Sequence, residues 1–126
     1  MTAYVYRAFA ADGALLYVGS SVRLGDRMRR HYRDSRWWFA AKRFTFTAYA
    51  TEAEARAVEV EAIRQEFPRW NINDRSPEHP DGWRLGIRDI ARLYPGDDRR
   101  QTHRETWVNE GKWLRARLAS LHRLAA

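Results

Sequence analysis

The dipeptide Asp12-Gly13 stands between two short apolar segments and limits how the start of the chain can fold. Tyr4 to Phe9 is aromatic and β-branched enough to form a strand, and Ala14 to Val18 has the same character. Glycine accepts the positive φ that tight hairpin turns require, so an Asp-Gly pair between such segments is a strong hairpin signal. We therefore expect the chain to begin with two antiparallel strands.

A helix, a third strand and a second helix are predicted to follow this hairpin. Leu24 to Arg36 carries apolar residues at helical spacing, and Arg43 to Tyr49 alternates large apolar with small polar side chains, as a half-exposed strand does. The second helix is expected over Thr51 to Phe67, because Thr51 and Glu54 form a capping box and no glycine or proline interrupts the run. This order predicts an α+β fold: a small three-stranded antiparallel sheet, the hairpin plus the third strand, flanked by helices.

The chain changes character after the second predicted helix. Asn73 to Gly82 holds two prolines and a glycine and is typical of a linker or an irregular loop. A short helix is predicted over Trp83 to Leu93 and a longer one over Glu105 to Ala125. We accordingly divide the chain into a core, residues 1–75, and a helical C-terminal extension, residues 76–126, packed on or next to it.

Basic residues are concentrated in one part of the chain. The sequence has 23 Lys and Arg against 16 Asp and Glu, a formal net charge of +7, and Arg23 to Arg43 alone holds eight basic and two acidic residues. Glu52 to Glu66 reverses the balance, with five glutamates and two arginines. This segregation favours a basic surface that faces a polyanion, although a solvated helix face in an arginine-rich chain would give the same pattern.

Several classes of protein are excluded by composition. The chain has no cysteine, which excludes a disulfide framework, thiolate zinc sites and cysteine nucleophiles. It has no uninterrupted apolar run of about 18 residues and no leader in which basic residues precede an apolar stretch. We expect a cytoplasmic protein that contacts no membrane, of prokaryotic or phage-like origin. Whether it is a monomer or a homodimer is left open.

Two tyrosine-containing triplets, Tyr4-Val5-Tyr6 and Tyr17-Val18-Gly19, lie in the predicted hairpin. Arg27 follows the second tyrosine by ten residues, in the first predicted helix. A glutamate in the second predicted helix is followed nine residues later by a proline and twelve residues later by an asparagine. These three residues are Glu59, Pro68 and Asn71.

Together these spaced positions resemble the GIY-YIG nuclease family over roughly residues 3–72. Valine replaces isoleucine in both triplets, and Tyr4 replaces the first glycine. The resemblance implies an endonuclease that hydrolyses DNA phosphodiester bonds with one divalent ion, Mg²⁺ or Mn²⁺, in each active site. Mg²⁺ keeps several waters and often takes only one or two protein carboxylates, so a single glutamate is a sensible ligand.

Glu59 is the candidate metal ligand, because it borders the apolar stripe of the predicted helix. Glu61 falls about 200° away around the same helix and is expected to be solvated. The resemblance implies that Arg27 binds the scissile phosphate, a role that suits the bidentate guanidinium group. It makes Tyr17 the general base or the residue that positions the attacking water.

Tyr6 would support the same water network through its hydroxyl group. His31 lies four residues after Arg27, on the same helical face, and would transfer a proton or bind phosphate. The expected catalytic residues are therefore Tyr6, Tyr17, Arg27, His31 and Glu59. The expected nucleic-acid-binding residues are Ser20, Arg23, Arg30, Lys42 and Arg43, and Gly19 and Asn71 are expected to support the active-site backbone.

Two other functions stay open at this point. A non-catalytic nucleic-acid-binding module could retain the same fold, and a nuclease of this type could act on RNA or on single strands. The aromatic run Trp37-Trp38-Phe39 is also ambiguous, because it could stack on exposed bases or pack in the core.

Overall fold

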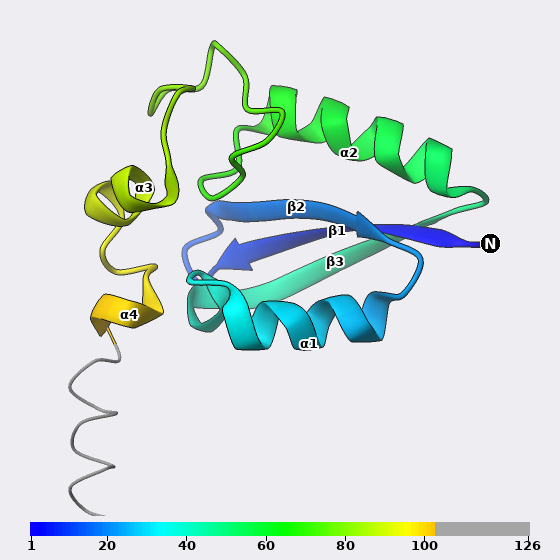
Figure 1. Ribbon diagram of the computed structural model, residues 1–126, viewed down its shortest axis with the longest axis horizontal. Helices are drawn as coiled ribbons and strands as arrows, with labels where there is room; N and C mark the ends of the chain where they lie inside the picture. Colours follow the sequence, from blue (N-terminus) through cyan, green and yellow to red (C-terminus); the bar gives the residue numbers. More distant parts are fainter. Residues whose placement is uncertain (103–126) are drawn as a thin grey trace, which may run out of the picture.

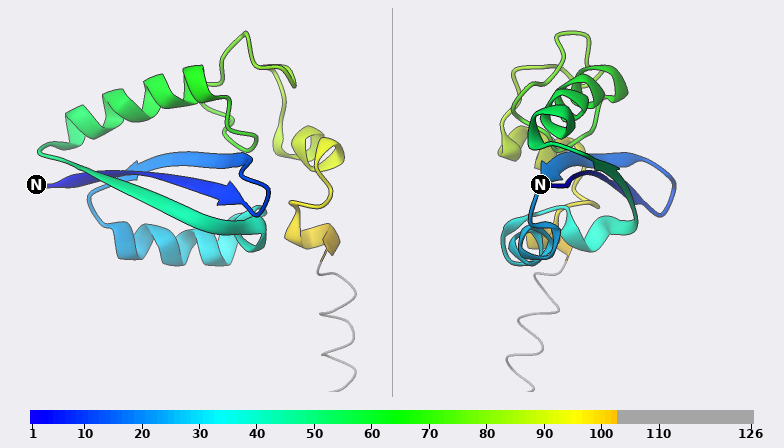
Figure 2. Two further views of the ribbon diagram at one scale, coloured as in Figure 1. Left: turned by 180° about the vertical axis from the view of Figure 1, so that it is seen from behind. Right: turned by 90° about the vertical axis from the view of Figure 1, so that its right-hand side faces the viewer.

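The computed structural model of the 126-residue chain describes residues 1–102. Three antiparallel strands, β1 (Ala3–Ala10), β2 (Leu15–Ser21) and β3 (Ala41–Tyr49), form one sheet in the order β2-β1-β3. Helices α1 (Leu24–Asp34) and α2 (Glu52–Glu66) lie on opposite sides of this sheet (Figures 1 and 2). The predicted α+β architecture with a three-stranded antiparallel sheet is confirmed.

The hairpin between β1 and β2 forms at the expected dipeptide. Gly13 has a φ of +89°, and the Asp12 carboxylate accepts a hydrogen bond of 3.0 Å from the backbone N–H of Ala14. β2 continues three residues beyond the predicted end at Val18, because Gly19 and the two serines after it pair with β1 despite their low strand propensity. In that register Tyr6 stands opposite Gly19.

Both helices of the core are bounded by local hydrogen bonds. α1 ends at Asp34, two residues before the predicted end, because Ser35 is extended and its N–H closes on the carbonyl of His31 at 2.9 Å. At the start of α2 the Thr51 hydroxyl accepts a hydrogen bond of 3.1 Å from the N–H of Glu54, as the capping signal indicates. Phe67 adopts the left-handed conformation and ends that helix.

The C-terminal segment differs more from prediction. Helix α3 (Ile87–Leu93) begins four residues later than Trp83, because Gly86 is extended and the Asp89 carboxylate accepts its N–H at 2.9 Å, which caps the helix there. A 3₁₀ turn, η1 (Trp38–Ala40), and a short helix, α4 (Arg99–Thr102), were not predicted. The helix predicted over Glu105 to Ala125 lies outside the described residues.

Two clusters of buried residues form the core. One lies between the sheet and α2, and the other joins the sheet to α3. Trp37 and Trp70 belong to the second cluster, with Ile90 and Ala91 of α3. Trp37 is therefore a core residue, and the helical part of the C-terminal segment shares a core with the sheet. The division of the chain at residue 75 stays a prediction.

Buried polar groups hold the loop after α2 together and tie the C-terminal segment to the residues that follow α1. The Arg75 guanidinium donates to the carbonyl oxygens of Arg69, Asn71 and Gly82 at 3.0, 3.1 and 2.6 Å. Asp98 is completely buried and accepts two hydrogen bonds, of 3.1 and 2.8 Å, from Arg36. Within residues 1–102 no helix combines the length and the hydropathy that crossing a membrane requires.

Candidate active site

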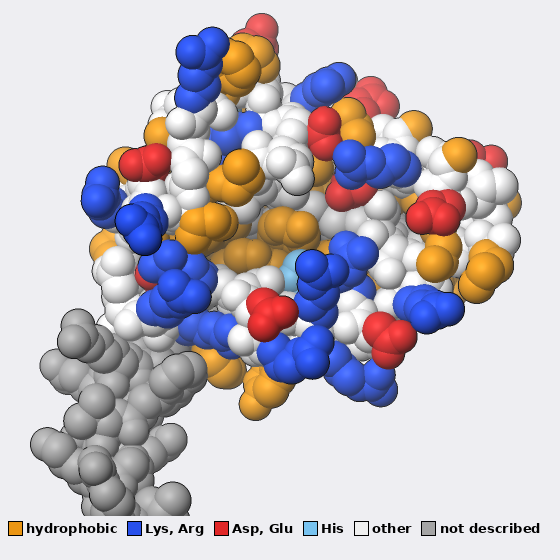
Figure 3. Space-filling view, viewed as in Figure 1, with side chains coloured by type: hydrophobic (Ala, Val, Ile, Leu, Met, Phe, Trp, Pro, Cys, Tyr) orange, Lys and Arg blue, Asp and Glu red, His pale blue; other side chains and the backbone are white. Residues whose placement is uncertain are grey.

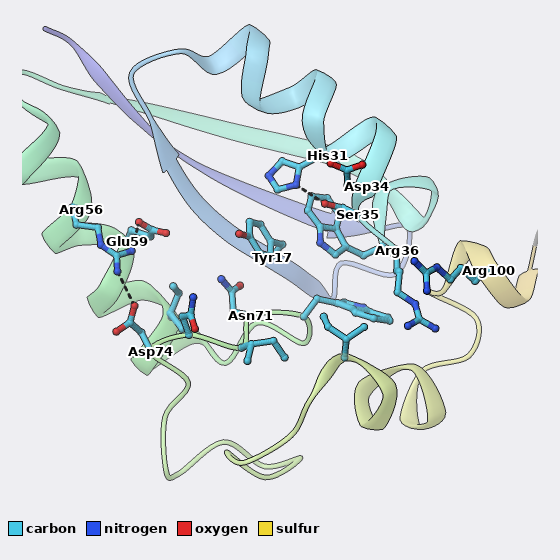
Figure 4. Close-up of a pocket in the computed structure, with 16 residues that line it drawn as sticks. Tyr17, His31, Asp34, Ser35, Arg36, Arg56, Glu59, Asn71, Asp74 and Arg100 are labelled. Carbon is cyan, nitrogen blue, oxygen red and sulfur yellow. Dashed lines mark hydrogen bonds and ion pairs between the residues drawn. The ribbon is translucent and has the colours of Figure 1, made fainter.

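A groove of about 470 Å³ runs along one face of the molecule. Apolar side chains gather in this hollow beside a histidine, and basic side chains border it (Figure 3). Glu59 lies near one end, Tyr17 and Asn71 lie in the middle, and Arg36 and Arg100 lie at the other end (Figure 4). The groove is therefore built from β2, both core helices and the C-terminal segment.

Tyr6, His31 and Ser35 form a chain of hydrogen bonds that runs from the buried Tyr6 to the lining of the groove. The Tyr6 hydroxyl is 2.6 Å from Nε2 of His31, and Nδ1 of the same ring is 2.6 Å from the Ser35 hydroxyl. Burial, with the nearby charges of Arg27 and Arg30, lowers the pKa of His31 to about 4. Burial and the neighbouring Tyr17 raise the pKa of Tyr6. At neutral pH the imidazole is therefore uncharged, and one of its ring nitrogens donates while the other accepts in this chain.

Gly19 and Asn71 hold the backbone around this chain. A Cβ on Gly19 would overlap the hydroxyl end of the Tyr6 ring and lie 2.9 Å from its Cε1 atom, so only glycine leaves room for Tyr6. The Asn71 side chain accepts from the N–H of Val18 at 2.9 Å and donates to its carbonyl at 2.8 Å. These contacts fix the position of β2 beside Tyr17.

Tyr17 presents its hydroxyl group to the groove. Its ring stacks on Trp37 at a centroid distance of 4.9 Å and lies 5.1 Å from the His31 ring. No residue in the described range 1–102 hydrogen-bonds to this hydroxyl, whereas Tyr6 is fully buried and already bonded to His31. Burial and the charge of Glu59 raise the pKa of Tyr17, against the opposing effects of Arg27 and Arg30. Tyr17 is thus the phenol that a bound substrate could reach.

Glu59 has one engaged and one open carboxylate oxygen. Its Oε2 accepts from the Ser20 hydroxyl at 2.6 Å and from Arg56 at 2.8 Å, and Arg56 also donates to Asp74 at 3.0 Å. No residue of the described part donates to Oε1, and no buried side-chain polar atom there lacks a partner, so Oε1 is open to solvent. Glu61, in contrast, is exposed on the far side of α2, as expected.

The open oxygen of Glu59 fits a cation that binds through one carboxylate. Among residues 1–102 no group of three or more His, Asp or Glu side chains could hold a metal ion. A single carboxylate with one open oxygen suits Mg²⁺ or Mn²⁺, whose other coordination positions are filled by water and phosphate oxygens. It does not suit zinc, whose sites usually take three or four protein ligands.

The predicted basic residues fall into two groups. Arg27 and Arg30 line a smaller hollow of about 300 Å³ that shares Tyr17 and His31 with the groove, and Arg23 lines the next hollow, near the start of α1. Lys42 and Arg43 lie on β3, at the other edge of the sheet from β2, and do not line the groove. There Lys42 donates to the carbonyl of Phe39 and Arg43 stacks on Phe9, so no contact links them to the catalytic set.

Several residues of the site were not predicted from the sequence. Arg56 precedes Glu59 by three residues, a helical spacing at which oppositely charged side chains pair, and this signal could have identified it. Ser35, Asp74 and Arg100 reach the groove only through the path of the chain after each helix. No local pattern marks them.

In a comparison with models of known protein families, the UvrC-like GIY-YIG domain matches residues 2–72. The match spans more than half of the chain, and the chain belongs to this family. Comparison with curated proteins and with solved structures finds no match. Membership of the family indicates a hydrolase of the nuclease type with a nucleic acid as substrate.

Proposed function

We propose that the protein is a cytoplasmic endonuclease that hydrolyses DNA phosphodiester bonds with Mg²⁺ or Mn²⁺, one ion in each active site. The observation that carries this proposal is that Tyr17, Arg27 and Glu59 meet around connected hollows of one surface. Phosphodiester hydrolysis needs an activated water, a cation at the phosphate and a group that accepts or orients a proton. These three residues supply the corresponding groups.

Glu59 is the residue that would hold the divalent ion, through its open oxygen Oε1. Ser20 and Arg56 both bond to the other oxygen and so fix the orientation of the carboxylate. When bound, the ion supplies positive charge at the phosphate and makes a coordinated water more acidic. Ser20, expected from the sequence to contact nucleic acid, supports Glu59 in this arrangement.

Arg27 would bind the scissile phosphate and stabilise the charge that develops when water attacks. A guanidinium group keeps its charge and can donate two parallel hydrogen bonds to phosphate oxygens. It lies beside Tyr17 and His31 in the smaller hollow, next to Arg30. In the reaction the water oxygen bonds to phosphorus while the bond from phosphorus to the leaving sugar oxygen breaks.

Tyr17 would orient the attacking water and then accept its proton. Its raised pKa keeps the phenol protonated in the free protein, so it first acts as a hydrogen-bonding group. The charges of Arg27, Arg30 and Arg56 oppose this shift and favour the ionised phenol. To act as a base, the phenol would first release its own proton to solvent; the phenolate would then accept the proton of the attacking water, and solvent would protonate the leaving sugar oxygen. Both ring nitrogens of His31 are already engaged in hydrogen bonds with Tyr6 and Ser35. Tyr6 and His31 would therefore act by positioning the Tyr17 phenol.

A binding module without activity is the second candidate, and the position of Glu59 argues against it. A carboxylate only 8% exposed beside phosphate-binding arginines repels the ligand of a simple binding protein, whereas a metal-dependent nuclease requires it. An RNA or single-strand nuclease keeps the same chemistry with a different substrate.

The test is a cleavage assay with the full chain. Labelled single-stranded, duplex and branched DNA, and matching RNA, are incubated with Mg²⁺, with Mn²⁺ or with EDTA. We expect endonucleolytic cuts in at least one DNA that disappear in EDTA. Binding without cleavage of any substrate would support the binding module, and cuts in RNA alone would assign a ribonuclease.

A further inference from the structure

The chain returns to the groove after the family match ends at residue 72. Arg100 of α4 lies with Arg36 at the end of the groove away from Glu59 (Figure 4), and Ile87 of α3 also lines the groove. This end exists because Asp98 bonds to Arg36 and the second buried cluster holds α3 against the sheet. Part of the groove is thus a feature of this chain beyond the matched domain.

Apolar side chains make up part of the groove lining. Trp37 and Trp70 line the groove and are only 3% and 2% exposed, so they belong to the packed core as well. Ile72 and Ile87 are 39% and 38% exposed, so their apolar surfaces face the opening. An exposed apolar surface at the rim of a hollow is typical of a site for a flat or apolar group.

Two polar side chains of the groove lining are free to bind a ligand. Within residues 1–102 the exposed side chains of Asn73 and Arg100 form no hydrogen bond or ion pair, and both line the groove. An asparagine amide can donate to and accept from the edge of a base, and an arginine can bind a phosphate. The acidic Asp74 also lines the groove, near Glu59, and is already paired with Arg56.

We propose that this end of the groove binds the base of an unpaired nucleotide next to the scissile phosphate. The proposal rests on the proposed nuclease function and names its substrate: a nucleic acid with an unpaired nucleotide at the cleavage site. The base would lie between the Ile72 and Ile87 side chains, with Asn73 at its edge and Arg100 on a neighbouring phosphate. The groove volume of about 470 Å³ lies within the range of about 300–1,000 Å³ for sites that enclose a small ligand.

Duplex DNA without a defect does not fit this arrangement. A paired base is covered on both faces by its neighbours, so it cannot enter a walled groove unless it leaves the stack. An unpaired base has free faces and edges, and its entry costs less. The cationic border and its continuity with the Arg27 hollow favour a nucleotide over an apolar peptide.

Binding in EDTA tests the pocket without depending on cleavage. Fluorescence anisotropy with the full chain compares three labelled DNAs: a paired duplex, the same duplex with one unpaired nucleotide, and that duplex with an abasic residue at the unpaired position. We expect the unpaired nucleotide to improve affinity about tenfold over the duplex. The abasic residue has the same flexibility without a base, and we expect it to bind no better than about twofold over the duplex.

Ile87→Asn and Leu93→Asn form a matched pair for this experiment. Both residues are exposed on α3, but Leu93 does not line the groove. We expect Ile87→Asn to lose the preference for the unpaired base and Leu93→Asn to keep it, with equal duplex binding and equal thermal unfolding for both. Equal affinity for the base and the abasic residue, or an equal effect of the two variants, would overturn the pocket.

The cleavage assay separates this inference from the proposed function. If the protein prefers the unpaired base but cuts no DNA, the base-binding pocket is supported and the nuclease function is contradicted. If the protein cuts DNA but shows no preference for the unpaired base, the nuclease function is supported and the base-binding pocket is contradicted.

Discussion

The ring of Tyr6 on β1 lies directly against the backbone of Gly19 on β2, where a side chain would otherwise stand. The two residues are paired across the sheet, and the space left by the missing Cβ is filled by the hydroxyl end of the tyrosine. From this position the Tyr6 hydroxyl reaches His31 at 2.6 Å. The last residue of the second triplet is therefore a glycine for a steric reason.

We expect Gly19→Ala to destabilise the protein by about 1–3 kcal/mol, because the Tyr6 ring must move out of a packed core. Urea unfolding at neutral pH measures the change. Gly25→Ala is the control: a Cβ there meets no atom within 4 Å, and alanine in a helix is expected to leave stability unchanged or raise it by up to about 1 kcal/mol. Equal unfolding curves for the two variants would show that the contact is unimportant.

The order and type of the core elements could be predicted because each has a local signal. Asp12-Gly13 marks the hairpin, and the Thr51 cap marks the start of α2. The end of β2 could not be predicted, since Gly19 joins the strand through its partner on β1 and not through its own propensity. The start of α3 depends on a single side-chain contact, from Asp89 to the N–H of Gly86.

Stability should fall in mild acid because of His31. Its pKa of about 4 in the folded protein lies below the ordinary 6.5, so as the pH falls from 6.5 towards 4 the unfolded chain binds a proton that the folded chain does not. The stabilisation is fully present above pH 6.5, and the loss should reach roughly 2–3 kcal/mol near pH 4. Unfolding in urea at pH 7.5, 6 and 5 measures it.

His31→Gln removes this titration and serves as the comparison. Its free energy of unfolding should fall less steeply between pH 6.5 and 5 than that of the original chain. NMR of the imidazole signal that the variant lacks gives the pKa directly. A ring that titrates near 6.5 would contradict the buried, uncharged state described above.

Asp98 should contribute more to stability than any surface carboxylate. Burial raises its pKa, but hydrogen bonds from Arg36 and from the N–H of Arg100 outweigh this effect and hold the pKa below its ordinary value. Asp98→Ala would leave the half-buried Arg36 without its partner, at a cost of about 3 kcal/mol or more. Asp26→Ala, which breaks an exposed pair with Arg29, should cost less than about 1 kcal/mol. Chemical denaturation of both variants decides between these values.

Arg27 is expected to act mainly on the rate of cleavage. Arg27→Lys keeps the charge but loses the second hydrogen bond to phosphate, and we expect a loss of about 10²-fold in kcat. The matched variant is Arg29→Lys, whose exposed side chain pairs with Asp26 and does not line the groove or the two smaller hollows. Single-turnover rates with Mg²⁺ measure both, and similar rates for the two variants would remove Arg27 from the proposed site.

The candidate site was predictable where spacing along the chain brings residues to one face. Arg27 and His31 share a face of α1, and Glu59 borders the buried side of α2. The end of the groove at Arg100 depends on the fold of the chain after Asn71 and on the Arg36–Asp98 pair, which join residues 62 positions apart. Sequence spacing carries no information on such a contact.

Glu59→Gln, compared with Glu61→Gln on the same helix, tests the central claim most directly. Glu59 has a carboxylate oxygen open to solvent beside the groove. Glu61 is exposed on the other side of α2, and within residues 1–102 its side chain bonds only to Gln65. With DNA and Mg²⁺ we expect Glu59→Gln to abolish cleavage while binding in EDTA survives, and Glu61→Gln to cleave at the original rate. Unchanged cleavage by Glu59→Gln would contradict the assignment of this carboxylate as the metal ligand.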